Sequence, residues 1–91
     1  MTLGERLRKL RELNGLAQRQ IGALIDVDGA FISKVENGDK PLNRNHLSTL
    51  ANYFKVDEEE LQILWLADKI YSLLNEEKLA NKVLKEVSNR I

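Results

Sequence analysis

The sequence predicts an all-α fold on two observations: apolar residues recur at helical spacing along the chain, and residues typical of helix ends separate the recurring segments. The first segment shows both features. Its leucines, at positions 3, 7, 10 and 13, form one stripe along a helix. Thr2 and Glu5 have the spacing of a capping box at its start, and Gly15 can end it in the left-handed conformation.

Two shorter helices are expected over residues 18–25 and 29–37, because the apolar spacing is helical on each side of Asp26 and breaks across it. Asp tolerates the left-handed backbone of a sharp turn better than most residues. Asp28 can cap the second helix, because its carboxylate can accept hydrogen bonds from free backbone N–H groups. Ala17 offers no such acceptor to the first helix, which should cost about 1 kcal/mol.

Three more helices should follow. Asn43 is a plausible cap for the first of them, and Asp57 has capping-box spacing to Glu60 at the start of a helix over residues 58–74. That helix is apolar almost all round, so it must be covered on several sides. Asn75 is then expected to cap a last helix with a wide apolar stripe. We divide the chain into a domain over residues 1–74 and an extension over 75–91, used for packing or dimerisation.

Composition excludes several functions. The chain has 91 residues and no cysteine, so one small domain is expected, without disulfides or thiolate metal sites. A single histidine, His46, and the lack of catalytic or phosphate-binding motifs predict neither an enzyme nor a cofactor or metal site. No signal peptide or membrane span is apparent, so we expect a cytoplasmic protein with no membrane partner.

The formal net charge is zero, but the charge is unevenly distributed. Residues 1–44 carry eight Lys and Arg against six Asp and Glu, whereas residues 45–91 carry six against eight. The positive half is therefore the one that contains residues 18–37, as binding to a polyanion would require.

The stretch over residues 16–38 carries a motif. Leu16-Ala17-Gln18 opens it, Gly22 follows four positions after the glutamine, Asp26 lies at the turn, and Ile32-Ser33-Lys34-Val35-Glu36-Asn37-Gly38 closes it. This pattern resembles the helix-turn-helix of the lambda repressor and Cro family, also called the Xre type. The resemblance implies a five-helix lambda-repressor-like DNA-binding domain with an additional C-terminal helix, and a helix-turn-helix proper over residues 17–37. It also implies that helix 29–37 passes too close to Gly22 for a side chain.

The resemblance places helix 29–37 in the major groove of double-stranded DNA. The positions then expected near base edges are Gly29, Ala30, Phe31, Ser33 and Lys34. Of these, Lys34 can donate to guanine O6 and N7, whereas Gly29 and Ala30 cannot form bidentate hydrogen bonds. Direct readout should therefore be sparse, and DNA shape should supply much of the specificity. The expected phosphate contacts are Gln18, Arg19, Asn37, Lys40, Arg44 and Asn45.

Two further expectations concern contacts within and between chains. The resemblance implies an ion pair between Arg11 and Glu36. It also implies a homodimer, because one recognition helix covers few base pairs and two must reach half-sites about 34 Å apart. The apolar surplus near the C-terminus is the expected dimer contact, and the alternative is that it fills the core of one chain. Its members are Leu64, Trp65, Tyr71, Val83 and Val87.

The sequence thus predicts a sequence-specific transcriptional regulator, a repressor or an activator, with no effector domain. Small family members include phage repressors, controller proteins of restriction-modification systems and antitoxins. The long C-terminal helices favour the controller-like type. The alternative is a protein-interaction module, such as an antitoxin whose C-terminal helices bind a toxin, or a regulator that contacts polymerase.

Overall fold

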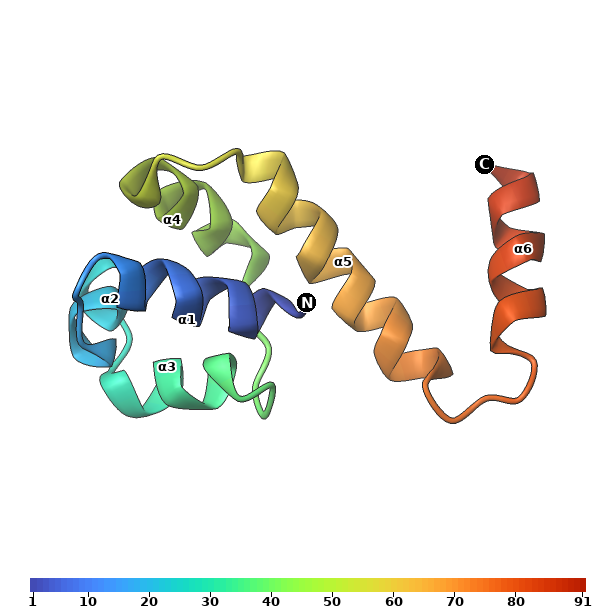
Figure 1. Cartoon of the computed structure of the whole chain (residues 1–91), viewed down its shortest axis with the longest axis horizontal. Coiled ribbons are helices and arrows are strands. Elements are labelled where there is room, and N and C mark those ends of the chain that lie inside the picture. Colours follow the sequence, from blue (N-terminus) through green and yellow to red (C-terminus); the bar gives the residue numbers. More distant parts are fainter.

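The computed structural model describes all 91 residues, and every regular element in it is helical. The helices are α1 (Leu3–Leu13), α2 (Gln18–Leu24), α3 (Gly29–Glu36), the 3-10 helix η1 (Arg44–His46), α4 (Leu47–Phe54), α5 (Glu58–Leu74) and α6 (Ala80–Arg90). Helices α1 to α4 gather around the start of α5, which runs outward, and α6 stands apart at the far end (Figure 1). The all-α prediction, with an extra C-terminal helix, is confirmed. None of these helices is both long enough and apolar enough to cross a membrane.

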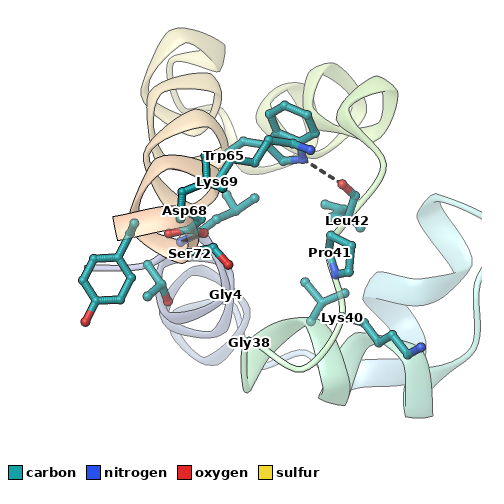
Figure 2. Close-up of a pocket in the computed structure, with 14 residues that line it drawn as sticks. Gly4, Gly38, Lys40, Pro41, Leu42, Trp65, Asp68, Lys69 and Ser72 are labelled. Carbon is teal, nitrogen blue, oxygen red and sulfur yellow. Dashed lines mark hydrogen bonds between the residues drawn. The ribbon is translucent and has the colours of Figure 1, made fainter. Parts of the chain in front are cut away.

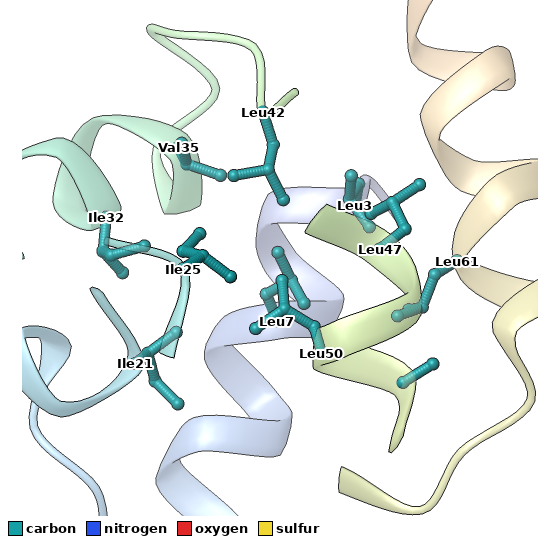
Figure 3. Close-up of a cluster of buried hydrophobic side chains, with 11 residues drawn as sticks. Leu3, Leu7, Ile21, Ile25, Ile32, Val35, Leu42, Leu47, Leu50 and Leu61 are labelled. Carbon is teal, nitrogen blue, oxygen red and sulfur yellow. The ribbon is translucent and has the colours of Figure 1, made fainter. Parts of the chain in front are cut away.

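One apolar cluster holds the domain together, and Figure 3 shows its side chains converging from α1, α2, α3, α4 and α5. Leu47, Leu50 and Leu61 are its most deeply buried members, with no exposed surface. Its eleven residues are Leu3, Leu7, Ile21, Ile25, Ile32, Val35, Leu42, Leu47, Leu50, Ala51 and Leu61. The last of them lies in the first turn of α5, so the cluster ends where the chain leaves the domain.

The helix ends explain why α1 and α3 begin where they do. The Thr2 hydroxyl accepts from the Glu5 backbone N–H at 3.1 Å, and the Glu5 carboxylate accepts from the Thr2 N–H at 2.9 Å. The hydrogen bond from the Thr2 backbone N–H, and after it the interaction with the Thr2 side chain, lowers the pKa of Glu5 below its ordinary value. Asp28 caps α3 by accepting from the Phe31 N–H at 2.7 Å. Gly15 has a positive φ of 64°, as expected of a left-handed helix end.

Helix α2 is less well capped, as the sequence predicts. Ala17 has the extended backbone of an N-cap residue but no side-chain acceptor. Only the reverse half of a capping box forms, in which the Gln20 side chain accepts from the Ala17 N–H at 2.7 Å. A Cβ added to Gly22 would lie 2.4 Å from the Val27 carbonyl oxygen. The close approach expected at Gly22 is therefore real, and the turn that leads into α3 makes it.

Two helix starts differ from the prediction. Asn43 caps η1, where its side chain accepts from the Asn45 N–H at 2.9 Å, and α4 begins four residues after Asn43, at Leu47. Asn75 ends α5 instead of capping the last helix, which begins at Ala80 without a side-chain cap. Asn75 keeps a helical backbone and its N–H bonds to the Tyr71 carbonyl at 2.8 Å, so it continues the geometry of α5.

The expectation that α5 is covered on several sides is wrong, because one of its apolar faces stays uncovered. Leu61 is the only residue of α5 that is buried. Ile63, Leu66, Ile70 and Leu73 stay exposed. The physical reason is that α5 extends beyond the domain, so no other element of the chain lies against this face (Figure 1).

Candidate nucleic-acid interface

Helices α2 and α3 pack against each other as a bihelical unit. Asp26 adopts the left-handed backbone that the turn requires, with φ of 60°. Ile21 of α2 and Ile32 of α3 are both buried in the core, so each helix is anchored along its inner face. The Val27 N–H also bonds back to the Gly22 carbonyl at 2.9 Å. The pairing of α2 with α3 is thus fixed by apolar burial on one side and by the turn at one end.

The outer face of α3 is free of intramolecular cover. Ala30 and Lys34 are exposed, and Ser33 is half-buried. Phe31 is half-buried and packs against the core, so its ring helps to anchor the helix. A Cβ on Gly29 would lie 3.1 Å from the Arg19 backbone nitrogen, so this position lies against the start of α2. A shallow hollow runs along this face, lined by Val27, Asp28, Ala30, Phe31, Lys34 and Lys40.

The ion pair expected between Arg11 and Glu36 is present, and it ties α1 to the end of α3. Arg11 Nε lies 2.7 Å from Glu36 Oε2, and Arg11 Nη2 donates to Oε1 at 3.0 Å. The Glu36 side chain is only 2% exposed and the Arg11 side chain 13%. Hydrogen bonding to Glu36 raises the pKa of Arg11, because it favours the charged guanidinium. The remaining guanidinium group donates to the Leu16 carbonyl at 2.9 Å.

Gln18 belongs to the same network, which the sequence did not predict. Its Nε2 donates to Glu36 Oε1 at 3.0 Å. The start of α2 is therefore held against the end of α3 by the carboxylate that also binds Arg11. A helix-turn-helix places the start of α2 near the end of α3. This proximity is the signal that could have predicted the contact between Gln18 and Glu36.

The other expected phosphate contacts differ in how free they are. Arg19, Asn37, Lys40 and Asn45 are exposed. Arg44 is also exposed, but its Nε donates to the Gln62 side chain and its guanidinium lies 5.2 Å from the centre of the Trp65 ring. A cation over an aromatic face is electrostatically attracted to it. Arg44 is thus oriented by α5, a contact that sequence spacing does not reveal.

Residues expected at a dimer contact fall into two groups. Leu64 and Trp65 are half-buried against their own core, which is the alternative considered for them. Trp65 Nε1 donates to the Leu42 carbonyl at 2.7 Å. The Trp65 side chain also lines an open groove between α5 and the loop after α3 (Figure 2). Tyr71, Val83 and Val87 are exposed, with 68%, 39% and 44% of their surface accessible.

The chain belongs to a known family of domains. Residues 2–64 match the family described as helix-turn-helix domain, which is more than half of the chain. No curated protein and no solved structure matches the sequence. The matched region contains α1 to α4 and the start of α5, and it ends before most of α5 and before α6. The fold and the family together indicate a helix-turn-helix DNA-binding domain.

Proposed function

We propose that this protein is a transcriptional regulator of the lambda repressor and Cro type, without catalytic activity, that binds specific double-stranded DNA as a homodimer. The observation that carries the proposal is the outer face of α3, where Ala30 and Lys34 are exposed while Ile32 and Val35 are buried on the opposite face. A helix held in this way can enter the major groove without any rearrangement of the domain.

The backbone contacts follow from the ends of the helices. The free N–H groups at the start of α2 carry a partial positive charge that favours a phosphate. The Gln18 amide has two N–H donors, of which one serves Glu36, so the other can bind a phosphate oxygen. Further phosphate contacts are proposed for Arg19, Asn37, Lys40, Arg44 and Asn45, all of them exposed. These contacts fix the register of α3 and carry no sequence information.

Base readout rests on few side chains. Lys34 is the one long donor among the proposed base-contacting residues and can reach guanine O6 and N7. Ala30 offers a methyl group to thymine, while Gly29 offers only its backbone. Much of the specificity must then come from DNA shape and from the pairing of two half-sites. A controller-like regulator fits this arrangement.

Selection of bound sites from random duplexes tests the role of Lys34. Lys34→Ala should lose preference at one base pair per half-site, worth about 1–3 kcal/mol, while the rest of the site is still selected. Lys40→Ala is the matched control, because it removes an exposed lysine proposed to bind phosphate. It should weaken binding to every sequence equally and reduce the salt dependence. Equal weakening by Lys34→Ala on all sequences would contradict its role in base readout.

One observation also supports the alternative of a protein-interaction module. Helix α6 has no buried residue, and its apolar side chains face solvent. Such a helix could bind a toxin or a polymerase subunit. A salt titration with mixed-sequence DNA separates the two functions, because non-specific binding by a helix-turn-helix regulator strengthens steeply as salt is lowered. No binding even at about 50 mM salt would favour the interaction module.

A further inference from the structure

Helix α6 is the one long element that has no partner. It has eleven residues, none of them buried, and it packs extensively against no other helix. Isolated helices shorter than about 12–15 residues are only marginally stable in water. Its exposed apolar residues include Val83, Leu84 and Val87, and the exposed Ile91 follows directly after it. A helix of this kind is stable when another surface covers its apolar face.

The connection before α6 holds it away from its own α5. The Glu77 N–H bonds to the Leu74 carbonyl at 3.0 Å, and the Ala80 N–H bonds to the Glu77 carbonyl at 3.2 Å. These bonds give residues 75–79 a turned shape of their own, and α6 leaves this turn at a distance from α5 (Figure 1). In this arrangement no other helix of the same chain covers the apolar face of α6.

Helix α5 offers a surface of matching pattern and length. Ile63, Leu66, Ile70 and Leu73 are exposed, at spacings of three, four and three residues. Ala80, Leu84, Val87 and Ile91 have spacings of four, three and four. Both are seams of the kind that pack in coiled coils. At about 1.5 Å per residue each seam is roughly 15 Å long, so the two match end to end.

Charge selects which seams pair. Helix α5 carries four acidic residues and one lysine, whereas α6 carries three basic residues and one glutamate. Pairing α5 with a second α5, or α6 with a second α6, therefore joins like charges, and pairing α5 with α6 joins opposite ones. An antiparallel arrangement also brings Arg90, at the end of α6, toward the acidic first turn of α5 at Glu58, Glu59 and Glu60.

We propose that two copies of this chain exchange their last helices, so that α6 of each copy packs antiparallel on α5 of the other. The seams then meet in four layers, with Ile63 opposite Ile91, Leu66 opposite Val87, Ile70 opposite Leu84, and Leu73 opposite Ala80. The partner is a second copy because each chain carries both complementary seams, and the two seams lie apart within one chain (Figure 1). This inference rests on the proposed function only in that a homodimer is the form that binds DNA.

Disulfide trapping tests the exchange, because the chain has no cysteine of its own. The full-length double variant Ile70→Cys/Leu84→Cys is oxidised at a concentration where light scattering reports twice the 10.4 kDa chain mass. Both substitutions replace exposed residues outside the core. Exchange predicts a covalent dimer on non-reducing gels, since paired seam positions bring the two Cα atoms within disulfide range. Mixing the two single variants, each with a different tag, should yield a disulfide that joins both tags.

The control is Ile70→Cys/Asn89→Cys, which moves the second thiol to the polar face of α6 and should give at least tenfold less covalent dimer. A disulfide within single chains would show that α6 folds back on its own α5 and would overturn the exchange. A covalent dimer of Ile70→Cys alone would indicate pairing of two α5 helices and would also overturn it, as would a monomer by light scattering. DNA binding by the same variants, measured separately, reports on the proposed function, so failure of one is distinguishable from failure of the other.

Discussion

The N-terminal domain and the C-terminal helices of this molecule differ in how far their apolar side chains are buried. Residues 3–61 contain every side chain of the apolar cluster and the buried ion pair between Arg11 and Glu36. From Ile63 onward nothing is fully buried, and ten of the thirteen exposed large apolar residues lie there. Apolar residues recur at helical spacing in both regions. An amphipathic pattern therefore predicts that one face of a helix is covered. It does not predict whether the covering surface belongs to the same chain or to another.

The largest expected effect comes from the buried ion pair of the domain. Arg11→Ala leaves the Glu36 carboxylate buried without its cation, which should lower the free energy of unfolding by about 3–5 kcal/mol. Because the pKa of Arg11 is raised above its ordinary value, the guanidinium stays charged at neutral and moderately alkaline pH, and the loss should be constant from pH 6 to 10. Urea unfolding measures it. Arg8→Ala, which breaks the exposed pair with Glu12, is the control and should cost less than about 1 kcal/mol.

Alanine substitutions of one buried and one exposed leucine test the difference in burial between the domain and α6. Leu50→Ala empties a site with no exposed surface and should lower the free energy of unfolding by about 2–5 kcal/mol at any protein concentration. Leu84→Ala removes an exposed side chain from α6 and should leave the domain intact. Its effect should appear only in the concentration dependence of the unfolding midpoint, measured over a hundredfold range. An equal loss from both variants at all concentrations would place α6 in the core of a single chain.

A substitution at Gly22 tests how tightly α2 packs against the turn before α3. Helix propensity alone predicts that Gly22→Ala stabilises the protein by about 1 kcal/mol. The added Cβ would meet the Val27 carbonyl oxygen, which is backbone and cannot rotate away. We therefore expect a net loss of about 1–3 kcal/mol, measured by thermal or urea unfolding. A gain in stability would show that α2 and the turn can separate at no cost.

The smallest expected effect concerns the start of α1. The pKa of Glu5 is lowered in the folded protein, so its contribution to stability is complete above the unfolded pKa and disappears as pH falls through the folded pKa. Glu5→Gln keeps an oxygen acceptor for the Thr2 N–H but does not titrate. The difference in melting temperature between the two proteins should be constant from pH 6 to 8 and should shrink below about pH 4.5. An unchanged difference at pH 3 would contradict the capping role of the carboxylate.

Local signals predicted the domain well where one residue decides one helix end. Thr2 with Glu5, Asp28 and Gly15 all act as expected, because caps depend on a few atoms of neighbouring residues. Asn43 and Asn75 were harder to place, because asparagine can cap a helix, enter a turn or end a helix. The role of Gln18 also depends on Glu36, which is eighteen residues away, and no local rule links them.

By itself the sequence determined the helices, the tight turn at Asp26 and the motif that closes α3, because hydrophobic spacing and capping act within a few residues. The tertiary structure decided that Leu64 and Trp65 pack inward, that Arg44 is held by α5 and that α6 lies apart from its own chain. The reason is that an apolar face is buried only where another helix or loop lies beside it. That space is set by how the first four helices close around their core, which no local stretch of sequence encodes.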